Sequence, residues 1–111
     1  MQFDVDDFSH TIHANAVAKG FWDANTEENR TIFYLKQLAM IHSEVSEVLE
    51  AIRKEKGHEI VVEELADIMI RTMDLWAGMS WDHYTNVSLK DSIYNKVKKN
   101  EDRPKMHGVL A

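Results

Sequence analysis

The sequence predicts an all-α domain that folds as a bundle of roughly four to five helices. Apolar residues recur at the three-to-four-residue spacing of helices over several long segments. The chain contains one proline and four glycines, too few for the many turns of an all-β sandwich or barrel. Its 111 residues match the size of one ordinary domain, so we expect residues 1–111 to form a single domain.

The composition excludes several classes of protein. The absence of cysteine excludes a disulfide framework, a thiolate zinc site and a cysteine nucleophile. No apolar run approaches the roughly 20 residues that span a bilayer, and the acidic start of the chain lacks a secretory pattern, so we expect a cytoplasmic protein without membrane contact. The net charge is −6, and residues 1–89 are strongly acidic, which disfavours nucleic acid as a partner. From Lys90 onward six Lys/Arg residues face three Asp/Glu residues, and this basic segment could hold a small anion.

The first two helices are read from apolar spacing and from capping residues. The first covers about residues 5–19 and is followed by a loop over residues 20–25. Thr26 can cap the second helix, which we expect over about residues 27–56, with Gly57 as its end. The apolar stripe of the second helix consists of Leu38, Ile41, Val45, Val48 and Ile52.

The third helix is expected over about residues 59–77, with Gly78 just past its end. Apolar residues cover most of its circumference, apart from a narrow charged strip. The strip consists of Glu63, Glu64, Asp67, Arg71 and Asp74. A helix that is apolar nearly all round is buried, and one small monomer can hardly cover it, so we expect a homodimer, with a tetramer of two dimers as the larger alternative. A fourth helix over about residues 81–99 precedes a tail with Pro104, and the short loops predict antiparallel neighbours.

Two of these helices each carry a pair of acidic residues at i, i+3 spacing. Glu44 and Glu47 lie on the second helix, and Glu64 and Asp67 lie on the third. Residues three apart share one face, so the pairs would converge if the two helices face each other. Such a cluster needs a cation, and carboxylate oxygens suit Mg²⁺ or Mn²⁺. The alternative interpretation is a solvated acidic face in which Asp67 pairs with Arg71 along the helix.

Three segments of the chain resemble the MazG-type all-α nucleotide pyrophosphohydrolases. The family pattern of Glu-x-x-Glu, a longer gap and Glu-x-x-Asp matches residues 44–47 and 64–67. Two further segments are similar to a small, single-domain branch found in phages and bacteria. They are Lys19-Gly20-Phe21-Trp22-Asp23, and Lys96, Asn100, Arg103-Pro104 and His107-Gly108 near the C-terminus. The resemblance implies the dimer-forming helical bundle of the all-α NTP pyrophosphatases.

The resemblance also implies a reaction, in which a nucleoside triphosphate is cleaved between its α and β phosphates for control of the nucleotide pool. The products are the nucleoside monophosphate and pyrophosphate. Carried over to this chain, Glu44, Glu47, Glu64 and Asp67 would bind Mg²⁺, with Mn²⁺ as the alternative ion. Glu47 is favoured as the carboxylate that orients the attacking water. Glu44 is the other catalytic candidate, because the sequence does not separate a metal ligand from a base.

The same resemblance gives the basic tail a role in substrate binding. Lys96 and Arg103 would contact the β and γ phosphates, and Asn100 would bind the sugar or a phosphate. The alternative is a solvated helix end favoured by the helix dipole. The chain departs from the family at Val109, since a lysine commonly follows the His-Gly pair.

The nucleotide base needs an apolar stacking surface, for which Trp22, Phe21, Trp76 and Trp81 are candidates. Trp22 is favoured because it lies in a short loop, and His42 could reach the base or the sugar. The remaining histidines that we assign to the surface are His10, His13, His58 and His83.

Other functions fit parts of the sequence. The same fold and metal site could act on another pyrophosphate compound, such as a phosphoribosyl nucleotide. A non-enzymatic helical interaction module would need neither metal nor nucleotide. A di-iron bundle requires Glu-x-x-His on two helices, and the one candidate, Glu55 to His58, spans the glycine that ends a helix.

Overall fold

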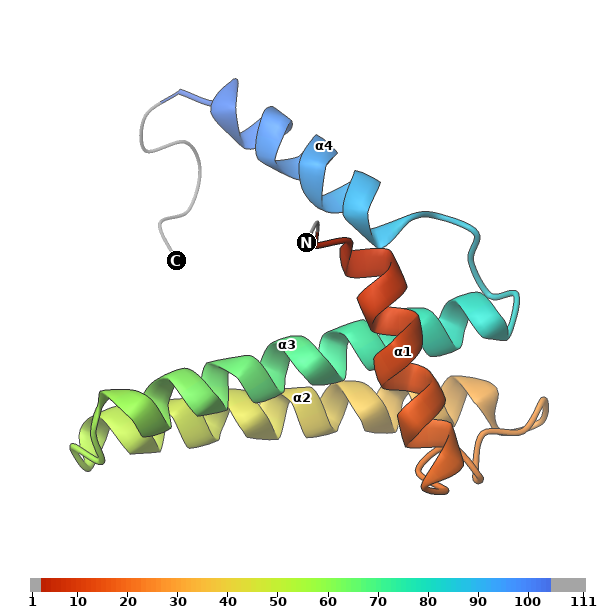
Figure 1. Ribbon diagram of the computed structural model, residues 1–111, viewed down its shortest axis with the longest axis horizontal. Coiled ribbons are helices and arrows are strands. Elements are labelled where there is room, and N and C mark those ends of the chain that lie inside the picture. Colours follow the sequence, from red (N-terminus) through yellow and green to blue (C-terminus); the bar gives the residue numbers. More distant parts are fainter. Residues whose placement is uncertain (1–2, 105–111) are drawn as a thin grey trace.

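The computed structural model describes residues 3–104, which form four helices and no strand. The helices are α1 (Val5–Ala18), α2 (Arg30–Arg53), α3 (His58–Trp81) and α4 (Leu89–Glu101). The long helices α2 and α3 form an antiparallel hairpin, α1 crosses α3, and α4 packs on the start of α1 (Figure 1). The predicted all-α fold is confirmed. Each helix in this range is too short or too polar to cross a bilayer.

The second helix begins one turn later than predicted. Thr26 does not cap this helix, because the N-cap of α2 is Asn29, but Oγ1 of Thr26 accepts the backbone N–H of Asn29 at 3.3 Å. The carbonyl of Thr26 accepts the same N–H at 3.1 Å, so residues 26–29 close a tight turn and α2 starts at Arg30. α2 ends at Arg53, before the predicted end at residue 56, so Gly57 does not end this helix. Gly57 is instead the N-cap of α3, with a φ of 105°, a conformation that favours glycine.

Gly78 does not end the third helix, because α3 continues through it to Trp81. The glycine is needed for packing instead. A Cβ atom at this position would lie 2.6 Å from Cζ3 of Trp22, so only a glycine lets the indole ring rest against the α3 backbone. The prediction of a C-terminal cap was wrong for this reason.

The fourth helix begins at Leu89 and not at residue 81, as the sequence had predicted. The chain breaks at His83, whose φ of 61° lies in the left-handed region. Ser88 then caps α4 and donates its hydroxyl to Asp6 of α1 at 2.6 Å. The other oxygen of Asp6 accepts the backbone N–H of Lys90 at 2.8 Å. A carboxylate from α1 thereby neutralises the positive end of α4 and fixes where the helix begins.

The hydrophobic core lies where α1 and the loop after it meet α2 and α3. Its buried residues are Trp22, Phe33, Tyr34 and Leu75, with Ala16, Ile41 and Met79 packed against them. Beside the core, the Tyr34 hydroxyl donates to Asp82 at 2.7 Å, and Asn25 donates to the same carboxylate at 2.8 Å. Burial and the hydrogen bond to Asp82 raise the pKa of the Tyr34 hydroxyl above its ordinary value. The contacts join α2, α3 and the loop at one end of the hairpin.

The rest of the hairpin exposes many apolar side chains in the single chain. On α3, Val62 and Met69 are each 62% exposed. On α2 the exposed apolar residues include Ile32, Leu35, Leu38, Val45, Leu49 and Ile52. The expected burial of the third helix is therefore not achieved within one copy of residues 3–104.

Candidate active site

Two neighbouring turns of α2 and one turn of α3 bring three carboxylates together. One oxygen each of Glu44, Glu47 and Glu64 lies within 4.8 Å of the others. The i, i+3 spacing places Glu44 and Glu47 on one side of α2, and the antiparallel hairpin sets Glu64 opposite them. Asp67 follows one turn later on α3 and lines the adjoining pocket together with Glu44. Three of the four acidic residues predicted to converge thus lie together between α2 and α3, and Asp67 lies beside them.

The cluster is electrostatically unfavourable without a cation. A hydrogen bond with Glu44 is the largest cause that raises the pKa of Glu47, followed by the negative charge of Glu44. The charges of Glu64 and Asp67 act in the same direction. The donor set consists of carboxylate oxygens alone, which are the ligands that hard divalent cations prefer. The residues therefore fit a divalent metal ion.

Arg71 supplies a cation to this cluster, which the sequence had not predicted. Its Nε donates to Oε1 of Glu44 at 2.9 Å, from α3 across to α2. The alternative interpretation of a solvated acidic face paired Arg71 with Asp67, one turn before it on the same helix. In the sequence, Arg71 is recognisable only as a basic residue within the acidic strip of α3. Its spacing does not indicate a partner on α2.

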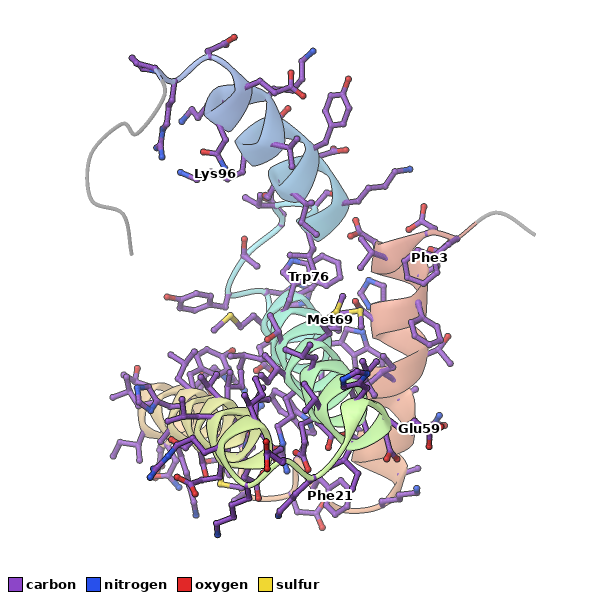
Figure 2. All side chains as sticks on the ribbon, turned by 90° about the vertical axis from the view of Figure 1, so that its left-hand side faces the viewer. Phe3, Phe21, Glu59, Met69, Trp76 and Lys96 are labelled. Atoms are coloured by element: carbon purple, nitrogen blue, oxygen red, sulfur yellow. The ribbon has the colours of Figure 1, made fainter. Side chains whose placement is uncertain are left out.

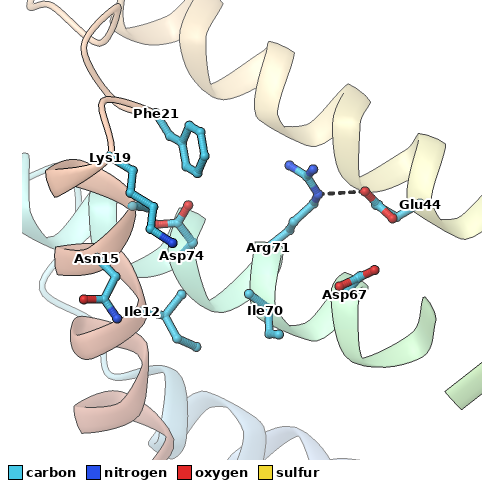
Figure 3. Close-up of a pocket in the computed structure, with 10 residues that line it drawn as sticks. Ile12, Asn15, Lys19, Phe21, Glu44, Asp67, Ile70, Arg71 and Asp74 are labelled. Atoms are coloured by element: carbon cyan, nitrogen blue, oxygen red, sulfur yellow. Dashed lines mark hydrogen bonds and ion pairs between the residues drawn. The ribbon is translucent and has the colours of Figure 1, made fainter. Parts of the chain in front are cut away.

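A pocket of about 340 Å³ extends from the carboxylates toward α1. Glu44, Asp67 and Arg71 line one end, while Lys19 and Phe21 line the other (Figure 3). The Phe21 side chain is 68% exposed. The pocket therefore offers cationic groups and an exposed aromatic ring beside an acidic cluster.

The wall of the pocket rests on a buried network that centres on Asp74. Nδ1 of His13 lies 2.7 Å from Oδ1 of Asp74, and because a carboxylate only accepts, this nitrogen carries the proton. Nε1 of Trp22 donates to both oxygens of Asp74, at 3.1 and 3.0 Å. The His13 ring meets the rings of Trp22 and Trp81 edge-on, each at 4.4 Å between centroids. His13 is 2% exposed, so its assignment to the surface was wrong.

The aromatic residues predicted to stack on a base have different environments. Trp22 is 7% exposed and belongs to the core, although it also lines a second pocket of about 350 Å³ with Phe21. Trp76 is half-buried and donates to the carbonyl of Val87 at 2.9 Å. Phe21 is the exposed ring of this group that faces the pocket beside the carboxylates. His42 is exposed on α2 and does not line that pocket.

The basic residues of the C-terminal segment lie apart from the carboxylates in the single chain. Lys96 and Asn100 are exposed on α4, and Arg103 is exposed just after it. Helix α4 stands clear of α2 and α3 (Figure 1). Figure 2 shows Lys96 on this helix, away from the hairpin. One copy of the chain does not bring these residues to the site. The motif residues His107 and Gly108, and Val109 after them, lie outside the described residues.

The fold and the site together define a class of helical protein in which acidic residues on two facing helices can share a divalent cation. The family profile described as MazG nucleotide pyrophosphohydrolase domain matches residues 34–107, a range that includes all four carboxylates. The chain belongs to this family of metal-dependent hydrolases, as the sequence had indicated. Searches of curated proteins and of solved structures give no match.

Proposed function

We propose that the protein hydrolyses nucleoside triphosphates, ribo or deoxyribo, to the monophosphate and pyrophosphate, and so controls the cytoplasmic nucleotide pool. The observation that carries the proposal is the position of the carboxylates. Glu44 and Asp67 form one end of a pocket whose other end presents Lys19 and Phe21. A triphosphate needs cations and a nucleoside needs an apolar ring, and both are offered within one cavity.

The carboxylates of this chain would hold the ion and handle the proton of the attacking water. Glu44, Glu47, Glu64 and Asp67 would bind Mg²⁺, or Mn²⁺ in its place. The ion supplies charge neutralisation on the phosphoryl oxygens and on the pyrophosphate that leaves. Glu47 is exposed at the edge of the cluster, where its carboxylate can orient a water molecule and accept its proton. The water oxygen bonds to the α phosphorus, the bond from that phosphorus to the bridging oxygen breaks, and pyrophosphate departs.

The nucleoside would lie toward α1. The exposed ring of Phe21 offers a stacking surface, and base stacking on an aromatic side chain contributes about 1–3 kcal/mol. Lys19 adds a positive charge on the same wall of the pocket. Trp22 remains a proposed base contact through the second pocket, and His42 remains a proposed contact to the base or sugar.

A second copy of the chain would complete the site. The apolar residues that α2 and α3 expose form the natural surface for a homodimer, and two such dimers could pair as a tetramer. Helix α4 stands clear of its own hairpin (Figure 1), and in the proposed dimer it would contact the carboxylates of a partner. Lys96, Asn100 and Arg103 would then contact the phosphates from the neighbouring subunit.

The test is product analysis with a panel of eight NTPs and dNTPs and one phosphoribosyl nucleotide, each with Mg²⁺ and with EDTA. We expect Mg²⁺-dependent release of monophosphate and pyrophosphate, lost in Glu47→Gln and retained in Glu59→Gln. Glu59 is an exposed glutamate in the first turn of α3 and serves as the matched control.

Other reaction products would contradict the proposed reaction or change its substrate. Orthophosphate release would place the cleavage at the γ phosphate and contradict the α–β assignment. Turnover of the phosphoribosyl compound alone would replace the substrate class. No turnover of any compound, with no metal binding by calorimetry, would leave the helical interaction module as the better interpretation.

A further inference from the structure

Arg71 is the cationic residue that lies between the carboxylates and the pocket. Its ion pair with Glu44 crosses from α3 to α2, with the Arg71 side chain 40% exposed and the Glu44 side chain 13% exposed. Within residues 3–104, this is the one Lys or Arg ion pair that reaches the four predicted metal ligands. Asp67 lies one turn before Arg71 and Asp74 one turn after it on the same helix, yet the guanidinium pairs with the opposite helix.

The hydrogen bond to Glu44 fixes one edge of the guanidinium and leaves the other edge facing the pocket. Nε makes the bond to Glu44, and Figure 3 shows the two terminal nitrogens on the opposite side, toward Phe21 (Figure 3). Arg71 lines both the 340 Å³ pocket and the neighbouring 350 Å³ pocket that Phe21 shares. A guanidinium held in this way presents a planar pair of N–H donors whose geometry matches phosphate oxygens.

An anionic substrate in this pocket needs a positive side chain near the carboxylates. A nucleoside triphosphate is strongly anionic, and it would bind beside four carboxylates of the same sign. Lys19 lies at the far end of the pocket, so Arg71 is the positive side chain on the carboxylate side. Because its donors are fixed by Glu44, little side-chain entropy is lost when it binds an anion.

We infer that Arg71 is a substrate-binding residue that holds the phosphate chain of the nucleotide next to the metal ligands, with Glu44 orienting its guanidinium. The inference rests on the proposed function and adds to it a phosphate contact that comes from α3 of the same chain. It differs from the contacts proposed for Lys96 and Arg103, which come from α4.

Isothermal titration calorimetry separates phosphate binding from metal binding. One titration uses Mn²⁺ alone, and a second uses a non-hydrolysable α,β-imido nucleoside triphosphate in the presence of Mn²⁺. The variants are Arg71→Gln, Arg71→Lys and, as the matched control, Arg53→Gln, since Arg53 is an exposed arginine that pairs with Glu50 on α2.

We expect Arg71→Gln to weaken binding of the analogue about tenfold or more, the effect of losing a charge-assisted bidentate contact. Mn²⁺ binding without nucleotide should be no weaker than in the wild type, because the variant removes a cation that competes for Glu44. Arg71→Lys should recover part of the affinity, and Arg53→Gln should match the wild type.

Two outcomes would overturn the inference while the proposed function stands. The first is wild-type affinity for the analogue in Arg71→Gln. The second is a parallel loss of Mn²⁺ and analogue binding, which would mean that Arg71 acts on Glu44 alone. If the wild-type protein neither binds the analogue nor hydrolyses a nucleotide, the proposed function fails and the inference fails with it.

Discussion

Asp74 connects the buried core to the wall of the pocket through one carboxylate. Its oxygens accept hydrogen bonds from His13 and Trp22, two residues that are themselves buried. The same side chain lines the pocket together with Phe21 and Arg71. The position of the pocket wall therefore depends on a hydrogen-bond network that lies largely inside the molecule.

We predict that Asp74→Asn lowers the free energy of unfolding by about 1.5–3 kcal/mol, the range for hydrogen bonds to charged groups. The amide keeps one acceptor oxygen but loses the charge and the second acceptor. Urea denaturation followed by tryptophan fluorescence measures the loss. The control is Asp23→Asn in the exposed loop, expected to change the free energy by less than about 0.5 kcal/mol. Equal effects of the two substitutions would contradict the importance of the network.

The sequence could predict the acidic residues of the site but not their partners. Residues at i, i+3 share a face of any helix, so the two acidic pairs follow from spacing alone. The bond from Arg71 to Glu44 joins residues 27 positions apart, and the bond from His13 to Asp74 joins residues 61 positions apart. These contacts depend on how the helices are set against one another, which spacing within a single helix does not determine.

At the scale of the elements, the crossing of α1 over α3 depends on the absence of a side chain at Gly78. The Trp22 ring occupies the space in which a Cβ atom would lie. Trp22 lies in the loop after α1 and belongs to the core, so its close approach to Gly78 holds this loop against α3.

We predict that Gly78→Ala destabilises the protein, although alanine is the better helix former. Overpacking of a core costs about 1–3 kcal/mol, which exceeds the roughly 1 kcal/mol that alanine gains in helix propensity. Thermal unfolding followed by circular dichroism should show a lower Tm. In a Trp22→Leu background the same substitution should become neutral or stabilising. A raised Tm in the otherwise wild-type protein would show that the indole ring moves aside at little cost.

Two of the predicted helix boundaries failed where a distant side chain takes part. The four helices follow from apolar spacing, because each must bury one face. Glycine is typical of the end of a helix, which predicts an end at Gly78, whereas the packed Trp22 ring is the reason for a glycine at this position. The start of α4 is set by Asp6, whose carboxylate bonds to Ser88 and to the backbone of Lys90. Ser88, the cap of α4, is next to the boundary, but Trp22 and Asp6 are distant in the sequence from the boundaries they affect.

At the scale of the whole molecule, the acidic hairpin and the basic helix are separated. The carboxylates lie between α2 and α3, while α4 projects from the start of α1 (Figure 1). The proposed homodimer would resolve this separation if α4 of one subunit contacts the hairpin of the other.

We predict that two inactive variants restore activity when they are mixed. Glu47→Gln removes the proposed base, and the double variant Lys96→Gln, Arg103→Gln removes the proposed phosphate contacts from α4. If each site combines the hairpin of one subunit with α4 of the other, a mixed dimer contains one intact site. An equal mixture after subunit exchange should then reach about a quarter of wild-type turnover. No recovery, with exchange verified by mass spectrometry, would show that each chain builds its site alone.

The carboxylate end of the pocket is built by contacts that are local in the sequence, whereas the Lys19 and Phe21 end depends on contacts between distant segments. The carboxylates belong to one helical hairpin closed by residues 54–57, and such local contacts need little loop closure. Lys19 and Phe21 reach the pocket because α1 and the loop after it dock on α3, through the contacts of His13 and Trp22 with Asp74 that span 61 and 52 residues. A change that loosens α1 would therefore remove the Lys19 and Phe21 end of the pocket, while the carboxylates proposed as metal ligands stay together on the hairpin.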